Sequence, residues 1–214
     1  IPLRKNKQRR CIVIGNGPSL KQDIEKIASD SEADFLCVNH FADSEFYEKI
    51  KPELYVFLDP YFWRDDAHES FISKREKTFE LISNKTSWPL TILIPTYAKS
   101  YRPHQNFSSN NLIKVVYYSA AQTKGLPDWI AHRLFDTGLF TPPSINVLIH
   151  SIFLAARFGY AKVCFYGADT SWHESLVLNQ QTNELLIKYT HFYGESLESV
   201  FIDCQKNIKS NVSH

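Results

Sequence analysis

Small and polar residues follow several apolar runs of this sequence, at the points where buried strands would end. The segment Gly15-Asn16-Gly17-Pro18-Ser19 follows one such run, and Gly167-Ala168-Asp169 follows another. Ligands of doubly wound sheets bind beyond the carboxyl ends of the strands, near the place where the strand order reverses. The sequence therefore predicts one ligand site built from strand ends, with further contributions from Asn39-His40, Asp59-Pro60 and Pro95-Thr96.

The loop at 15–19 has the residue types that an anion cradle requires. Gly15 and Gly17 allow another group to approach the backbone closely, and Pro18 suits the first turn of a helix. The free N–H groups at the start of that helix would point at the anion. The alternative is a tight strand-to-helix turn capped by Ser19. The loop is neither the dinucleotide fingerprint nor a Walker loop, since no Gly-Lys-Ser/Thr follows it.

Strands and helices that alternate along the chain would position these loops. The pattern predicts an α/β fold, with a Rossmann-like, doubly wound, mostly parallel sheet and helices on both faces. We expect a basic lead-in at 1–10 and a single nucleotide-binding domain at 11–214, belonging to a fragment of a longer chain, because the sequence starts with Ile and contains no Met. Apolar runs predict buried strands at 11–15, 34–39, 53–59, 90–96, 112–119 and 161–169, the last clear strand. Apolar periodicity predicts helices at 18–28, 43–50, 68–82 and 144–160.

Bulk composition excludes some classes of partner. Lys plus Arg number 24 and Asp plus Glu number 23, so the net charge favours neither nucleic acid nor an anionic membrane. No apolar run approaches the length of about 18 residues that a membrane span needs. The four cysteines form no C-x-x-C pair, which favours a reducing compartment. We expect a cytoplasmic protein and leave open both a peripheral position at the inner membrane and an oligomeric state.

Several motifs in a fixed order carry a resemblance to known families. "IVIGNGPSL" is followed by a strand ending in "VN", a strand ending in Asp-Pro, then "ARFGYAKVCFYGAD" and "THFYGE". This order resembles the bacterial family often called DUF115 or MptE-like, which includes motility accessory factor glycosyltransferases and an archaeal 6-hydroxymethylpterin diphosphokinase. It is also similar to the bacterial sialyltransferases of glycosyltransferase family 42. The resemblance covers roughly residues 11 to 195.

The resemblance implies a nucleotide site at the strand ends. Asn16 and Asn39 match the asparagines that contact the CMP donor in the sialyltransferases, and Gly167 and Asp169 match a G-x-D motif whose Asp accepts hydrogen bonds from the nucleoside. Asp59 departs from the pattern, because those enzymes have Asn before this proline. A carboxylate there would repel a phosphate or hold a metal ion bound to one.

The resemblance also implies a catalytic base, although the match is weaker there. The sialyltransferases carry H-Y-x-G-H, whose last His deprotonates the acceptor, where this chain has the segment from His191 to Glu195. His191 is the preferred base because a neutral His lies near its working pKa, while Glu195 would need desolvation. Tyr193 would either donate a hydrogen bond to a phosphate or pack as an aromatic residue of the core. Further residues that could line the pocket are His40, Trp172 and His173.

Three functional hypotheses follow. The first is a glycosyltransferase that transfers a CMP-activated acidic sugar, such as a sialic, pseudaminic or Kdo-like acid, to a glycan or glycoconjugate acceptor and requires no cofactor. The second is a diphosphokinase that requires Mg²⁺, with Asp59 and Asp169 as metal ligands. The third is a non-catalytic nucleotide-binding module. Metal dependence separates the first two, and activity of the chain excludes the third.

Overall fold

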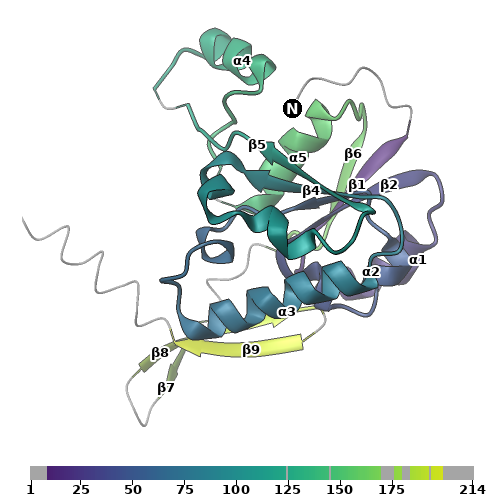
Figure 1. The fold of residues 1–214 in the computed structure, drawn as a ribbon, viewed down its shortest axis with the longest axis vertical. Helices are drawn as coiled ribbons and strands as arrows, with labels where there is room; N and C mark the ends of the chain where they lie inside the picture. Colours follow the sequence, from purple (N-terminus) through teal and green to yellow (C-terminus); the bar gives the residue numbers. More distant parts are fainter. Residues whose placement is uncertain are drawn as a thin grey trace, which may run out of the picture.

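A six-stranded parallel sheet forms the centre of the protein, shown by a computed structural model that describes residues 9–123, 125–144, 146–169, 176–179, 184–192 and 194–199 (Figure 1). The strand order is β5-β4-β3-β2-β1-β6, and every neighbouring pair is parallel. The predicted fold class is confirmed. The strands are β1 (Arg10–Ile14), β2 (Ala33–Val38), β3 (Leu54–Val56), β4 (Leu90–Pro95), β5 (Ile113–Tyr118) and β6 (Val163–Tyr166).

The order of the strands reverses between β1 and β6. Successive crossovers carry the chain from β1 outward to β5, and the chain then returns to place β6 on the other side of β1. The register pairs Ile14 with Tyr166, so the loops that follow these two residues leave the sheet at the same edge. This edge is the switch point at which doubly wound folds bind ligands.

Helices cover both faces of the sheet, as the alternating apolar residues of the strands require. Ile12 and Ile14 of β1 pack in the cluster that includes residues of α1 (Leu20–Ala28), α2 (Tyr47–Ile50) and α3 (Glu69–Lys85). Cys11 and Val13 pack in the opposite cluster, under α5 (Val147–Arg157). Successive side chains of a strand point to opposite faces, so one apolar run supplies both cores.

Three of the four helices that the sequence predicted are found with shorter bounds, whereas α3 ends three residues beyond the expected range 68–82. Residues 39–43, which follow β2, form the 3₁₀ helix η1 (Asn39–Asp43), and the helix expected at 43–50 is reduced to α2. The helix expected at 144–160 begins at Val147, where the Asn146 side chain accepts a hydrogen bond from the N–H of Ile149. Asparagine is a favoured cap for this reason.

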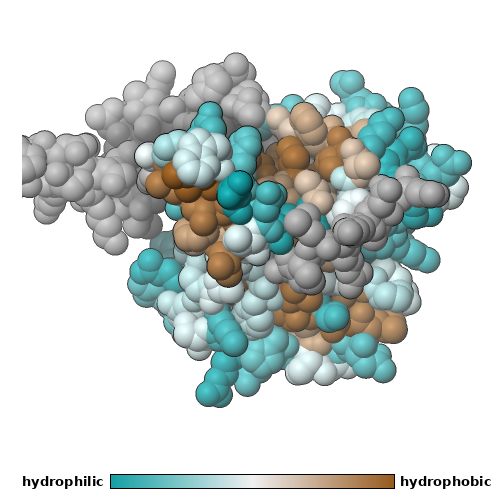
Figure 2. Space-filling view, turned by 90° about the horizontal axis from the view of Figure 1, so that it is seen from above, coloured by the Kyte–Doolittle hydropathy of each residue, from teal (hydrophilic) through white to brown (hydrophobic). Residues whose placement is uncertain are grey.

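A helix that the sequence did not predict, α4 (Asp128–Thr137), stands away from the body of the molecule (Figure 1). It lies in the segment that connects β5 to α5. Its Trp129 is 67% exposed. Leu126 and Leu139, which flank it, are exposed as well. Figure 2 shows the molecule from this side, with hydrophobic patches broken by polar surface. The helix has only ten residues, and most of them are exposed.

Three strands that the sequence did not predict follow β6, the last clear strand, and form a second, antiparallel sheet. They are β7 (Leu176–Asn179), β8 (Glu184–His191) and β9 (Gly194–Ser199), in the order β7-β8-β9. The apolar runs of this region are short, LVL in β7 and LLI in β8, which makes them a weaker signal than the longer runs of the parallel sheet.

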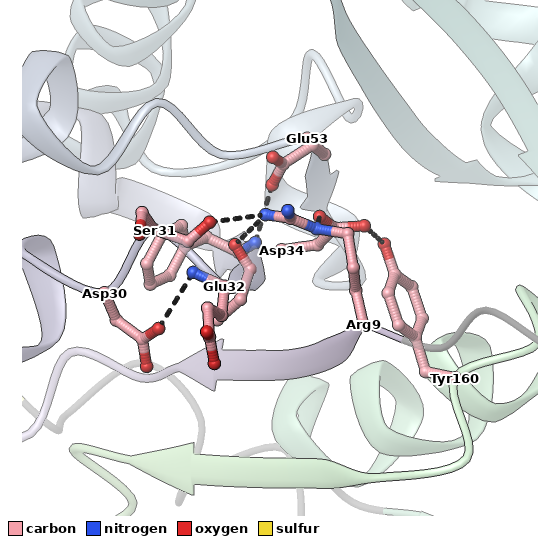
Figure 3. A network of polar contacts seen from close by, with 9 residues as sticks. Arg9, Asp30, Ser31, Glu32, Asp34, Glu53 and Tyr160 are labelled. Carbon is pink, nitrogen blue, oxygen red and sulfur yellow. Dashed lines mark hydrogen bonds and ion pairs between the residues drawn. The ribbon is translucent and has the colours of Figure 1, made fainter.

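Polar contacts fix the opposite, amino-terminal edge of the parallel sheet (Figure 3). Arg9 donates through Nε to Oδ1 of Asp34 and through Nη2 to the carbonyl of Ala33 at 2.8 Å. Tyr160 donates its hydroxyl proton to Oδ2 of Asp34, which is 7% exposed. Arg10, the first residue of β1, pairs with Asp30. The last two residues of the expected basic lead-in therefore belong to the folded structure.

None of the helices in the described ranges has the length and apolar composition that crossing a membrane would take.

Candidate functional site

The loops that follow β1 and β6 lie side by side at the switch point. The N–H of Gly15 donates to the carbonyl of Tyr166 at 2.8 Å, and the N–H of Gly17 donates to the carbonyl of Gly167 at 3.0 Å. A Cβ added at Gly15 would lie 3.0 Å from the carbonyl carbon of Gly167 and nearer still to its oxygen. Gly167 itself has a φ of 63°, which favours glycine. The group that approaches Gly15 closely is therefore the backbone of the second loop.

The side chain of Asp169 fills the space beside Gly17. A Cβ at Gly17 would lie 2.7 Å from Cγ of Asp169 and 2.8 Å from its Cβ. Oδ2 of Asp169 accepts hydrogen bonds from the N–H of Ser19 at 3.1 Å and from its hydroxyl at 2.8 Å. The free N–H groups and the dipole of α1 favour a negative charge at this position. The loop at 15–19 thus binds the carboxylate of Asp169, where the sequence predicted the anion of a ligand.

Ser19 and Pro18 take roles that differ in part from those expected. Ser19 makes no side-chain hydrogen bond that caps α1, because its hydroxyl donates to Asp169 instead. Pro18 is exposed and lies in the turn before Leu20, the first residue of the helix. The capping oxygen comes from the second loop rather than from within the first.

Two asparagines present buried amide oxygens at this edge. Nδ2 of Asn16 donates to the carbonyl of Val38 at 3.3 Å, and Nδ2 of Asn39 donates to Oδ2 of Asp59 at 3.0 Å. Oδ1 of each asparagine is buried and has no hydrogen-bond partner among the described residues. A buried acceptor without a partner costs free energy, so both oxygens are suited to bind N–H or O–H groups of a ligand.

Asn39 is held in place by its backbone. Its φ is 47°, in the left-handed region that Asn tolerates better than most residues. The hydroxyl of Tyr55, a fully buried residue of β3, donates to the carbonyl of Asn39 at 2.7 Å. The amide group of Asn39 therefore starts from a fixed position at the end of β2.

Asp59 places a partly buried carboxyl at the end of β3. Burial raises the pKa of this carboxyl above its ordinary value, and the hydrogen bond from Asn39 opposes part of that rise. Tyr97, which the sequence did not single out, donates its hydroxyl proton to the carbonyl of Leu58. Burial and the nearby charge of Asp59 raise the pKa of Tyr97 to about 12. Both groups therefore hold their protons more tightly than they would in water.

The turn between β8 and β9 meets the loop after β1. The N–H of Phe192 donates to the carbonyl of Asn16 at 3.2 Å. The ring of Phe192 stacks on Phe41 with centroids 5.6 Å apart and lies 6.4 Å from the ring of Phe46. A backbone hydrogen bond and an aromatic contact thus bring this turn to the switch point, although the sequence places it far from the first loop.

The proposed catalytic residues flank this turn in the backbone. His191 is the last residue of β8 and pairs with Gly194, and Glu195 pairs with Thr190. The structure brings their backbone to the edge where Asn16 lies, and their side chains lie outside the described part of the structure. Tyr193, Trp172 and His173 also lie outside the described residues, so their predicted roles stay predictions.

His40 does not line an open pocket, because the residue is 5% exposed and its ring is hydrogen-bonded at both nitrogens. Nδ1 lies 2.7 Å from Oγ1 of Thr78, and Nε2 lies 2.8 Å from the hydroxyl of Tyr61. Oγ1 of Thr78 in turn lies 3.0 Å from Oδ1 of Asp43. Sequence reasoning missed Tyr61, Thr78 and Asp43, since nothing in their spacing connects them with His40.

The two acidic residues considered as metal ligands are bonded separately. Asp59 accepts from Asn39, whereas Asp169 accepts from Ser19. In the part of the chain that the structure describes, no group of three or more His, Cys, Asp or Glu side chains is placed to hold a metal ion. The described geometry therefore gives no assembled donor set for Mg²⁺.

The fold and the strand-end loops define an α/β protein of Rossmann-like architecture with a polar site at its switch point. No model of a known protein family matches the chain, and no curated protein matches it.

Proposed function

We propose that this protein is a glycosyltransferase that uses a CMP-activated acidic sugar to build a surface polysaccharide or glycoconjugate. The observation that carries the proposal is the pair of buried, unpartnered amide oxygens of Asn16 and Asn39 at the switch point. A nucleoside offers amine and hydroxyl donors that would satisfy such acceptors. The order of motifs that resembles the sialyltransferases supports the same assignment of these two residues.

The charges at the site favour the nucleoside over the phosphate as the group that meets Asp169. One oxygen of this carboxylate holds Ser19, and the other has no hydrogen-bond partner among the described residues. A phosphate at the same helix terminus would meet a like charge, whereas a ribose hydroxyl would donate to the second oxygen. Asp169 would then connect the start of α1 with the bound nucleoside.

The transfer step needs a base for the acceptor hydroxyl and a leaving group that departs readily. CMP leaves as a phosphate monoester and carries its own negative charge, so the reaction as proposed uses no metal ion. His191 or Glu195 would take the acceptor proton, since the contact between Phe192 and Asn16 brings their turn to the site. A general base of this kind typically contributes about 10² to 10⁴ in rate.

Ligand-dependent stabilisation tests the proposal directly. Thermal unfolding is followed with CMP, CDP, UDP, GDP and ATP, each with and without Mg²⁺, because a ligand that binds only the folded state raises its melting temperature. We expect CMP and CDP to stabilise the protein without Mg²⁺, and the Asn16→Ala variant to lose the effect. Asn111→Ala, at an exposed position just before β5 and therefore at the edge of the sheet opposite the site, is the matched control.

Other outcomes of the same panel overturn the proposal. Stabilisation by ATP that appears only with Mg²⁺ would replace it with the diphosphokinase hypothesis. Stabilisation by CMP without turnover of any CMP-sugar would favour the nucleotide-binding module. If none of the nucleotides raises the melting temperature, the site does not bind nucleotides and the proposal is wrong.

A further inference from the structure

A chain of hydrogen bonds runs from a partly buried acid to a phenol at the carboxyl edge of the sheet. It joins Asp43, Thr78, His40 and Tyr61, with successive distances of 3.0, 2.7 and 2.8 Å. His40 directly follows Asn39 at the end of β2, and Tyr61 follows Asp59 by two residues at the end of β3. The phenol is therefore held at the same edge as the nucleotide site.

The direction of the protons follows from Thr78. Its hydroxyl has one proton, and two acceptors compete for it: Oδ1 of Asp43 and the carbonyl of Lys74, each at 3.0 Å. Nδ1 of His40 must then be the donor to Thr78, which leaves Nε2 with a lone pair. The proton of the Tyr61 hydroxyl consequently points at Nε2.

Aromatic packing keeps this geometry in place. The ring of His40 lies 5.0 Å from the ring of Phe62, and the ring of Tyr61 lies 5.0 Å from the ring of Phe71. Thr78 is fully buried on α3, while Tyr61 is only partly buried at the surface end of the chain. A base oriented by a third group and bonded to a nucleophile is the arrangement by which proteins activate hydroxyl groups.

We propose that Tyr61 is a base-activated phenol, with His40 as its base and with Thr78 and Asp43 as the groups that orient the base. When the phenol oxygen reacts, its proton moves to Nε2 of His40, and the positive charge that forms faces Asp43 through Thr78. The reactive end of the relay is the phenol oxygen, because the imidazole itself is buried.

The role of the relay in sugar transfer rests on the proposed function. The relay is an alternative to His191 and Glu195 as the base of that reaction: the acceptor hydroxyl gives its proton to the oxygen of Tyr61 while the phenol proton passes to His40. The acceptor oxygen forms a bond to the anomeric carbon, and the bond from that carbon to the CMP phosphate oxygen breaks. CMP leaves with the electron pair, so charge and protons balance.

Covalent labelling tests the activated phenol without any substrate. An aryl sulfonyl fluoride reacts with phenols: the oxygen–sulfur bond forms, the sulfur–fluorine bond breaks, fluoride leaves, and the phenol proton goes to the base. We expect Tyr61 to be labelled about tenfold or more faster than Tyr101 of the same molecule, which is 48% exposed. Mass spectrometry of peptides from one sample gives both rates. A Tyr61 rate at or below the Tyr101 rate overturns the proposal.

Variants separate activation from mere packing. His40→Gln and Thr78→Val should reduce the Tyr61 rate to that of Tyr101, whereas Thr78→Ser, which keeps the hydroxyl, should restore it. Melting temperatures identify any variant that fails to fold. The ratio of the Tyr61 and Tyr101 labelling rates in the wild type shows by itself whether Tyr61 is activated. A folded His40→Gln protein that keeps the wild-type rate shows that His40 is not the base.

Turnover distinguishes failure of the relay from failure of the proposed function. Tyr61→Phe keeps the ring and removes the hydroxyl, so CMP affinity should stay unchanged while CMP-sugar turnover falls by about 10²-fold or more. Unchanged turnover in this variant excludes the relay from catalysis. If the wild type neither binds CMP nor turns over a CMP-sugar, the proposed function fails, and the labelling ratio still decides whether Tyr61 is activated.

Discussion

Adding one methyl group at Gly17 should displace Asp169 from the start of α1. A Cβ there would lie 2.8 Å from the Cβ of Asp169 and closer to its carboxylate than any real contact. Rotation of the Asp169 side chain cannot remove the first of these contacts, so the loop after β6 must also shift. We expect Gly17→Ala to break both hydrogen bonds to Ser19.

The magnitude follows from what is lost. Removing a helix-capping oxygen costs about 1 kcal/mol, and the favourable interaction of a carboxylate with the helix dipole adds about 0.3–1 kcal/mol. The free energy of unfolding should therefore fall by about 1–2 kcal/mol in Gly17→Ala. At the scale of a domain this size, each kcal/mol corresponds to roughly 2–4 °C in melting temperature.

A double-mutant cycle with Asp169→Gly makes the reasoning testable. The Asp169→Gly background has neither the carboxylate nor the Cβ that Gly17 avoids. Since the φ of Gly17 lies outside the positive range, Ala at this position is compatible with the backbone. In that background Gly17→Ala should stabilise the protein by about 0.4–1 kcal/mol through the lower entropy of the unfolded chain. Gly17→Ala should thus lower the free energy of unfolding when residue 169 is Asp and raise it when residue 169 is Gly.

Urea denaturation of the four proteins measures the coupling energy. As a specificity control, Gly15→Ala should destabilise both backgrounds equally, because its Cβ meets the backbone of Gly167 rather than the side chain of Asp169. If Gly17→Ala costs the same in both backgrounds, Asp169 is not the group that requires glycine, and the internal anion described above is wrong.

Three further substitutions test separate parts of the structure. Asn39→Ala should weaken CMP binding by about 1–3 kcal/mol in calorimetry, with Asn111→Ala unchanged; equal affinities would remove Asn39 from the site. Tyr160→Phe should lower the free energy of unfolding by about 1.5–3 kcal/mol, because Oδ2 of Asp34 loses a donor inside the fold, and an unchanged urea midpoint would contradict this. The folded-state pKa of Asp59 lies above its ordinary value, which the unfolded chain keeps. Between these two pKa values the folded protein binds more protons than the unfolded chain, so the free energy of unfolding falls as the pH rises through this range. Asp59→Asn should therefore be more stable than the wild type at pH 7, and the difference in their free energies of unfolding should vanish as the pH falls to about 4. A difference that does not change with pH would show that the pKa of Asp59 is not raised.

The apolar runs were sufficient to predict the sheet and which loops gather at one edge. In a parallel sheet covered on both faces, a continuous apolar run serves both cores, so the strands are visible in the sequence without knowledge of their neighbours. The loops of Gly15 and Asp169 follow such runs directly, and their meeting at the switch point required only the expected topology. The helix α4 escaped prediction because its residues are mostly exposed and lie between proline-containing segments.

The internal partners at the site could not be predicted, because they join residues far apart in the sequence. Ser19 and Asp169 are separated by 150 positions, and His40 and Thr78 by 38. No short motif links either pair. The glycines were correctly identified as positions of close approach, yet sequence alone could not say whether a ligand or the protein itself makes that approach.

The position of β6 beside β1 has a consequence for the time at which the site forms during synthesis. The sheet from β1 to β5 is built by successive neighbouring crossovers, and such contacts form before those that close long loops. The loop after β6 is the last of the strand-end loops of the parallel sheet to leave the ribosome. At a synthesis rate of about 5–20 residues per second, the first loop waits roughly 8–30 seconds for its partner. During that interval α1 begins without the carboxylate that will hold it, and its free N–H groups face solvent.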